Sequence, residues 1–178
     1  MSETEVRGSG WLTPDDLEQA REALPMVYID AVPVRVDHAG VITHVGLLLR
    51  ARPDGSISRA VVSGRVLYRE RVRDALLRHL EKDLGPMALP RLPLSPSPFT
   101  VAEYFPDASV TGFHDPRQHA VSLAYVVPID GEAQPGGSSL DLAWLTPEEA
   151  TSPDVVIEMT GGQDRLVRLA LAASGRLP

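Results

Sequence analysis

The segment Gly64–Gly85, with the sequence GRVLYRERVRDALLRHLEKDLG, restricts the fold of this chain more than any other stretch. Apolar residues recur at every fourth position along it, at Val72, Leu76, Leu80 and Leu84. This spacing places them on one side of an α-helix, so the segment predicts a turn that leads into an amphipathic helix. The glycine that ends the segment is placed to adopt a left-handed conformation, and the proline after it cannot continue the helix. We therefore expect a loop, a helix and a sharp stop.

The polar residues of this helix form a second pattern. His79 precedes Lys82 by three residues and Asp83 by four, so the three share one helix face. Lys82 is the only lysine among the 17 basic residues of the chain. A lysine can hold a phosphate as a point charge, which makes this face a candidate anion site. An ordinary charged helix facing solvent is the alternative interpretation.

The spacing of the segment resembles the Nudix box, whose family pattern is GX5EX7REUXEEXGU with U an aliphatic residue. The framework positions of that pattern are matched by Gly64, Glu70, Arg78 and Gly85. In the family, the glutamate before the helix and the arginine within it form a salt bridge that fixes the loop against the helix. The resemblance therefore implies a Glu70–Arg78 ion pair in this chain.

The positions that carry the family's chemistry differ. His79 stands where the family has the glutamate after the arginine, and Lys82 with Asp83 replaces the following acidic pair. The resemblance implies Mg or Mn as cofactor, and magnesium prefers oxygen ligands such as carboxylates in near-octahedral geometry. Asp83 and Glu70 remain as candidate metal ligands, and His79 and Asp83 as candidate catalytic residues. We expect a poor metal site, with the Lys82 cation near the place of the metal ion.

Composition limits the classes of function open to the chain. Its 178 residues suit one domain, and we expect a flexible arm over residues 1–12 followed by a single Nudix-like domain over residues 13–178. With no cysteine, the chain has no disulfides, thiolate zinc sites or cysteine nucleophiles. The net charge of -7 argues against nucleic acid as the partner. No apolar run reaches membrane-span length, and a signal peptide is not evident, so we expect a cytoplasmic protein.

The remaining elements follow an order that is similar to that of Nudix proteins. Thr13 is placed to cap a helix over Pro14–Leu24, and five proline residues within residues 86–98 predict a surface loop. Strands are expected at Val27–Val36, Val41–Ala51, Ser58–Ser63, Phe99–Phe105, Ala120–Val127 and Leu140–Leu145, and further helices after Thr146 and over Gln163–Ala173. The resemblance implies an α/β fold, a Nudix-like α/β/α sandwich with a central mixed sheet.

Candidate ligand contacts come from three further places. Arg50 and Arg52, on the strand before the box, either face a phosphate or face solvent. Ser63 brings a side chain to a site where the family offers backbone. A DPR sequence before an apolar strand resembles a segment of ADP-ribose pyrophosphatases, and it supplies Arg117 and His119 as candidates. Together with Lys82, these residues form the expected ligand-binding set.

Three hypotheses follow. The leading one is a protein that binds a diphosphate-containing, nucleotide-like small molecule, with magnesium-dependent pyrophosphohydrolysis weakened or lost. The second is an active pyrophosphohydrolase in which Asp83 and Glu70 hold the metal and Glu103, Asp107 or Glu132 acts as base. The third is an interaction module that uses its proline-rich loop as the contact. A homodimer is expected from the resemblance alone.

Overall fold

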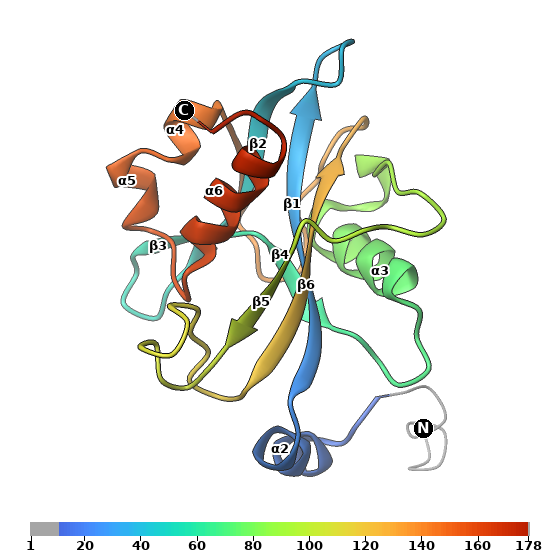
Figure 1. Cartoon of the computed structure of the whole chain (residues 1–178), viewed down its shortest axis with the longest axis vertical. Coiled ribbons are helices and arrows are strands. Elements are labelled where there is room, and N and C mark those ends of the chain that lie inside the picture. Colours follow the sequence, from blue (N-terminus) through green and yellow to red (C-terminus); the bar gives the residue numbers. More distant parts are fainter. Residues whose placement is uncertain (1–10, 178) are drawn as a thin grey trace.

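A computed structural model of the chain describes residues 11–177 and is built around one mixed sheet of seven strands (Figure 1). The strands are β1 (Met26–Val36), β2 (Ile42–Ala51), β3 (Ile57–Ala60), β4 (Val62–Arg65), β5 (Thr100–Tyr104), β6 (Ala120–Pro128) and β7 (Asp141–Leu145). They follow the order β3–β2–β1–β6–β5, with β4 paired to β1 and β7 paired to β2. β1 and β6 run parallel, whereas the other pairs are antiparallel.

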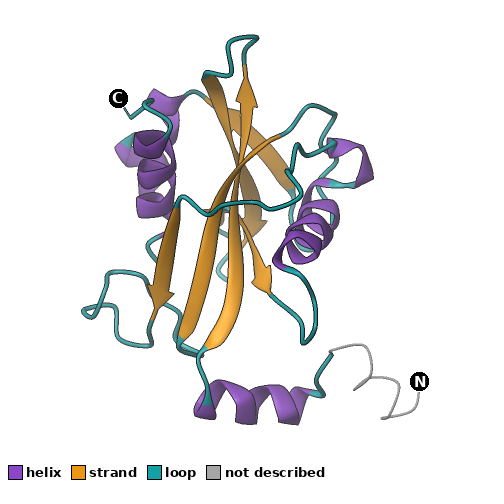
Figure 2. Cartoon of the chain, turned by 45° about the vertical axis from the view of Figure 1, so that its right-hand side comes forward, coloured by secondary structure: helices purple, strands orange, loops and turns teal. Residues whose placement is uncertain are grey.

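Helices cover both faces of this sheet (Figures 1 and 2). α3 (Val72–Leu84) lies on one face, and α4 (Pro147–Ala150), α5 (Pro153–Val156) and α6 (Gln163–Ala173) lie on the other. α2 (Pro14–Ala23) lies across one end of the sheet. The layers form the Nudix-like α/β/α sandwich that the sequence predicted. None of the helices within residues 11–177 has the length and apolar character needed to cross a bilayer.

The central strand β1 changes its neighbour along one edge. Its first half, through Ala31, pairs with β4, and its second half, from Val34, pairs with β2. The sequence predicted a single strand over Ser58–Ser63, and this was wrong. The segment instead divides at Val61 into β3, which joins β2, and β4, which crosses to β1, while the Val61 amide donates to the side chain of Gln163. The sheet therefore forks between β2 and β4.

The ends of α2 and α3 agree in part with the predictions made from local sequence. Thr13 caps α2 by accepting a hydrogen bond from the Asp16 amide at 3.2 Å, as predicted. α3 ends at Gly85, whose φ of 81° is positive, but its ψ of 165° differs from the left-handed helical conformation that we expected. Residues 1–10 of the predicted N-terminal arm lie outside the described residues.

Burial on α3 corrects the expected polar face. Leu76, Leu80 and Leu84 are fully buried against the sheet, as predicted. His79 and Asp83, expected on the opposite side, are buried too, with 6% and 2% of their surfaces exposed. Each directly precedes a buried leucine, and a helix that buries a wide stripe includes neighbouring positions. The polar residues are thus part of the buried side.

The proline-rich segment over residues 86–98 covers the α3 side of the sheet. It begins with one turn of 3-10 helix, η1 (Pro86–Ala88), which the sequence did not predict. Beyond this turn, the Arg91 amide donates to the Pro128 carbonyl, and Leu92 packs partly on the core beneath α3. The segment therefore forms the covering loop expected from its prolines.

Leu80→Ala should lower the free energy of unfolding by about 2–5 kcal/mol, because it removes a fully buried side chain from the contact between α3 and the sheet. Urea denaturation measures this loss. Glu81→Ala, at the exposed neighbouring position, is the matched control and should change stability by less than about 0.5 kcal/mol. Similar losses for the two variants would contradict the packing described for α3.

Candidate functional site

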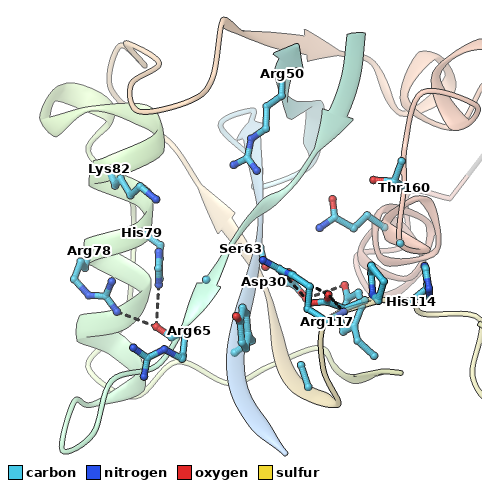
Figure 3. Close-up of a pocket in the computed structure, with 18 of the residues that line it drawn as sticks. Asp30, Arg50, Ser63, Arg65, Arg78, His79, Lys82, His114, Arg117 and Thr160 are labelled. Carbon is cyan, nitrogen blue, oxygen red and sulfur yellow. Dashed lines mark hydrogen bonds and ion pairs between the residues drawn. The ribbon is translucent and has the colours of Figure 1, made fainter. Parts of the chain in front are cut away.

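A cavity of about 720 Å³ lies at the fork of the sheet (Figure 3). α3 forms one wall, and the loop before β6 together with the start of α6 forms the other. Five cationic side chains line it, namely Arg50, Arg65, Arg78, Lys82 and Arg117. Its volume lies within the range of small-molecule sites, roughly 300–1,000 Å³.

Glu70 and Arg78 form the predicted ion pair. Arg78 donates to both carboxylate oxygens, from Nε to Oε1 at 2.7 Å and from Nη2 to Oε2 at 2.8 Å. Oε2 also accepts from the Leu67 amide, and Arg78 Nη2 donates to the Arg65 carbonyl at 2.9 Å. The hydrogen bonds from Arg78 lower the pKa of Glu70. One arginine therefore ties the loop, the end of β4 and α3 together.

His79 lies directly against Gly64. A Cβ atom built on Gly64 would lie 1.9 Å from Cε1 of the His79 ring, although the glycine backbone avoids the left-handed region. His79 Nε2 lies 3.0 Å from the Arg65 carbonyl, and Nδ1 has no hydrogen-bond partner among residues 11–177. Burial lowers the pKa of His79, which favours the neutral ring. Because a carbonyl only accepts, the hydrogen sits on Nε2, and Nδ1 is left as an acceptor.

Asp83 on α3 forms an ion pair with Arg50 on β2. Arg50 Nη2 on β2 lies 3.6 Å from Asp83 Oδ2, and the aspartate side chain is 3% exposed. Burial raises the pKa of Asp83, and the positive charges of Arg50 and Lys82 offset part of this rise. Arg50 and Lys82 line the cavity, whereas Asp83 itself does not (Figure 3). Within the described residues Lys82 has no ion-pair partner.

The opposite end of the cavity carries a second arginine–aspartate pair. Arg117 donates to both oxygens of Asp115, at 3.0 and 2.9 Å. Burial raises the pKa of Asp115, but the hydrogen bonds from Arg117 and Gln118, together with the charge of Arg117, lower the pKa below its ordinary value. Gln118 also donates to Asp115 and accepts from Arg21, which connects this loop to α2. The sequence placed Arg117 in the site, within the DPR sequence that also contains Asp115, but it gave no reason to expect the link through Gln118 to Arg21.

Asp30, which the sequence did not single out, lies between the two ends (Figure 3). It sits on β1, is completely buried, and accepts a hydrogen bond from the Tyr104 hydroxyl on β5 at 3.0 Å. Ser63, its register partner on β4, lies beside it and also lines the cavity. The available signal was a single carboxylate within an otherwise apolar strand, VYIDAVPV. A buried charged residue of this kind marks a position with a specific partner or role.

Two of the expected ligand contacts are outside the cavity lining. Arg52 donates to the Glu158 carbonyl at 3.0 Å. His119 stacks on Phe105 with ring centroids 4.3 Å apart. Arg50, Ser63, Lys82 and Arg117 do line the cavity. The predicted set is therefore brought together only in part.

The side chains present do not fit an ordinary magnesium site. Within residues 11–177, no three histidine, aspartate or glutamate side chains are grouped as metal ligands would be. Both oxygens of Glu70 are bound by Arg78, and Asp83 faces Arg50. Magnesium would have to compete with an internal cation for each carboxylate. Lys82, which has no ion-pair partner among the described residues, is instead available to bind an anionic group of a ligand.

The carboxylates considered as an alternative base do not enter the cavity. Glu103, Asp107 and Glu132 are all exposed, and none of them lines it. Glu103 points outward because alternate residues of β5 face solvent, and the other two are on surface loops. The hypothesis of a base supplied by these three residues is therefore wrong for this conformation.

Comparison with known proteins gives consistent matches. The profile of a family described as Domain of unknown function (DUF4916) matches residues 7–176. A crystal structure from Jonesia denitrificans, described as a possible asymmetric diadenosine tetraphosphate (Ap4A) hydrolase, is 63% identical, with 88% of this chain and 98% of that chain covered and a TM-score of 0.85. Among curated proteins, none matches.

More distant structures share the fold. A NUDIX-family hydrolase from Clostridium perfringens is 15% identical, with 86% and 98% of the two chains covered and a TM-score of 0.59. The NUDIX domain of Shewanella oneidensis NrtR, in complex with ADP ribose, is 18% identical, with 97% and 98% covered and a TM-score of 0.57. At these identities the likeness concerns the fold alone.

Gly64→Ala should lower the free energy of unfolding by about 1–3 kcal/mol, because the added methyl group overlaps the buried His79 ring. In a His79→Ala background the same change should cost much less, since the ring is gone. Chemical denaturation of the two single variants and the double variant measures this coupling. An equal cost of Gly64→Ala in both backgrounds would mean that the ring does not set the requirement for glycine.

Glu70→Gln should lower the free energy of unfolding at pH 7 by about 1.5–3 kcal/mol, because Arg78 loses its charged partner. The folded-state pKa of Glu70 is lowered from 4.5, so its stabilisation is complete above pH 4.5 and is lost as the pH falls through the folded value. The difference between the two proteins should therefore shrink in acid. Denaturation at several pH values measures it, with the exposed Glu22→Gln as control; a difference independent of pH would refute the assignment.

Proposed function

We propose that the cavity of this chain, which belongs to the family described as Domain of unknown function (DUF4916) and has the fold of NUDIX hydrolases, binds a diphosphate-containing, nucleotide-like small molecule. Magnesium-dependent hydrolysis of that ligand is weakened or lost. The observation that carries this proposal is the charge arrangement. Five cationic side chains line the cavity, while Glu70 and Asp83 are already paired with Arg78 and Arg50.

The charges favour an anionic ligand. Arg78, Arg50 and Arg117 each have an internal carboxylate partner, whereas Arg65 and Lys82 make no ion pair among residues 11–177. Unpaired cations suit phosphate groups, because a positive charge holds a phosphate without exact geometry. Lys82 in particular supplies charge at the end of the cavity where a metal ion would otherwise neutralise the phosphates.

Aromatic side chains of the cavity suit the rest of a nucleotide. Trp11 and Tyr28 line it, and aromatic rings provide flat surfaces on which a base can stack; one face of the Trp11 ring already lies against the Arg78 guanidinium, 5.4 Å from the ring centroid. The Shewanella domain is described in complex with ADP ribose, and the Jonesia protein as a possible Ap4A hydrolase. Both molecules join phosphates to adenosine, which is consistent with the ligand class proposed here.

An active pyrophosphohydrolase is the second candidate function. The 63% identity to the Jonesia protein favours it, because sequences this similar often keep one activity. In this chain the reaction would need a base other than the exposed carboxylates considered above. His79 and Asp83 are the candidates, since both are buried on α3; His79 lines the cavity, and Asp83, outside the lining, pairs with Arg50, which lines it.

ADP-ribose and inorganic pyrophosphate should bind in the absence of divalent ions. At 100 times its dissociation constant, each ligand should raise the free energy of unfolding by about 2.7 kcal/mol, measurable by thermal shift. Lys82→Gln should weaken both affinities about tenfold or more in titration calorimetry, because a charged contact is removed. Arg168→Gln removes one positive charge from an exposed position outside the cavity and should leave both unchanged.

Three results would overturn the proposal. Absence of binding by both ligands would refute a diphosphate site. An equal effect of Lys82→Gln and Arg168→Gln on the affinities would mean that Lys82 acts only through the net charge of the protein and makes no contact with the ligand. Hydrolysis of Ap4A or ADP-ribose at ordinary enzyme rates with magnesium, and its loss in Asp83→Asn, would establish the second function instead.

A further inference from the structure

Three arginines of the cavity lining form ion pairs among residues 11–177, and the pair between Arg50 and Asp83 is the loosest of the three. Arg78 and Arg117 each donate to both oxygens of their carboxylate partners, at distances of 2.7 to 3.0 Å. Arg50 Nη2 lies 3.6 Å from Asp83 Oδ2, which is longer than a hydrogen bond. Two parallel hydrogen bonds fix an arginine in one geometry, whereas a single long contact leaves it free to take another partner.

The Arg50 side chain is placed to take such a partner from the cavity. It extends into the cavity from β2 and is 34% exposed, and its Nε has no hydrogen-bond partner among residues 11–177 (Figure 3). Lys82 extends into the cavity from α3, on the other side. A planar guanidinium can donate two hydrogen bonds to one phosphate, and a lysine beside it adds a second positive charge. Arg50 is therefore the lining arginine that is best able to turn to a ligand.

Asp83 cannot follow Arg50 into the cavity. Its side chain is 3% exposed and lies outside the cavity lining, and the next residue, Leu84, is fully buried against the sheet. Burial raises the pKa of Asp83, and the charge of Arg50 offsets more of this rise than the charge of any other group. Asp83 thus holds a negative charge at a fixed position, beside a cation on a flexible side chain.

We propose that Asp83 is an internal competitor of the ligand for Arg50, so that a phosphate group draws the guanidinium away from Asp83 when it binds. This inference rests on the proposed function and concerns the phosphate end of the same ligand. In the empty cavity the ion pair neutralises Arg50, and this lowers the affinity for any phosphate that uses it. Asp83 is a positioning residue, because it acts through Arg50 and does not itself touch the ligand.

Titration calorimetry of the full chain with inorganic pyrophosphate, in a chelating buffer without divalent ions, tests this competition. Asp83→Asn keeps the shape of the side chain and removes its charge, so it should raise the affinity for pyrophosphate about tenfold. Damage to the fold would lower the affinity, so a gain separates competition from a structural role. Glu81→Gln removes the same charge from an exposed position on α3 outside the cavity lining, and this matched control should change the affinity by less than about twofold.

The double variant Arg50→Gln with Asp83→Asn tests whether Arg50 carries the effect. It removes both charges of the ion pair, so that neither is left buried without a partner. The gain seen with Asp83→Asn alone should disappear, and the affinity should return to the wild-type value or fall below it. Asp83→Ala is a second single variant in case Asp83→Asn does not fold, and its affinity for pyrophosphate should rise in the same way.

The outcomes separate this inference from the proposed function. Wild-type binding of pyrophosphate with no gain in either Asp83 variant would overturn the inference and leave the proposed function standing. The same gain in the double variant as in Asp83→Asn would overturn it too, because the effect would then not pass through Arg50. So would an equal gain in Glu81→Gln, which would attribute the effect to net charge. Absence of pyrophosphate binding by the wild type and by both Asp83 variants would refute the proposed function and the inference together.

Discussion

The ion pair between Glu70 and Arg78 is the interaction on which the site depends. Through Arg78 it joins the loop before α3, the helix itself and the carbonyl of Arg65 at the end of β4. The wall that carries His79 and Lys82 is therefore fixed relative to the strand that carries Ser63. Because the pair is mostly shielded from solvent and makes two hydrogen bonds, it is stronger than a typical surface ion pair.

Much of the fold could be predicted from the sequence, because its signals are local. The cap at Thr13 and the periodic leucines of α3 each set an element through neighbouring residues. The division of Ser58–Ser63 into two strands could not be predicted in this way. It depends on β2 and β1 competing as neighbours, and on Gln163, about a hundred positions later, which binds the amide at the break.

The candidate site, too, has a part that the sequence predicts and a part that it does not. Lys82 and Arg50 were predicted because they lie in or beside a recognisable segment, whereas Arg65, which also lines the cavity, was not singled out. Asp30 was missed because nothing in its own strand shows that Tyr104 and Ser63 surround it. Pairing between distant strands creates that environment. The cavity thus combines cations that the sequence indicates with a buried carboxyl, Asp30, whose surroundings exist only in the folded chain.

The parallel pairing of β1 with β6 has a consequence for how the protein forms. Met26 is registered with Ala120 and Val34 with Pro128, so the innermost strand lacks one of its neighbours until most of the chain has left the ribosome. Contacts this distant in sequence close large loops, which slows folding. An amino-terminal fragment would expose the apolar edge of β1 in the meantime, and such an unpaired edge favours aggregation until β6 is made.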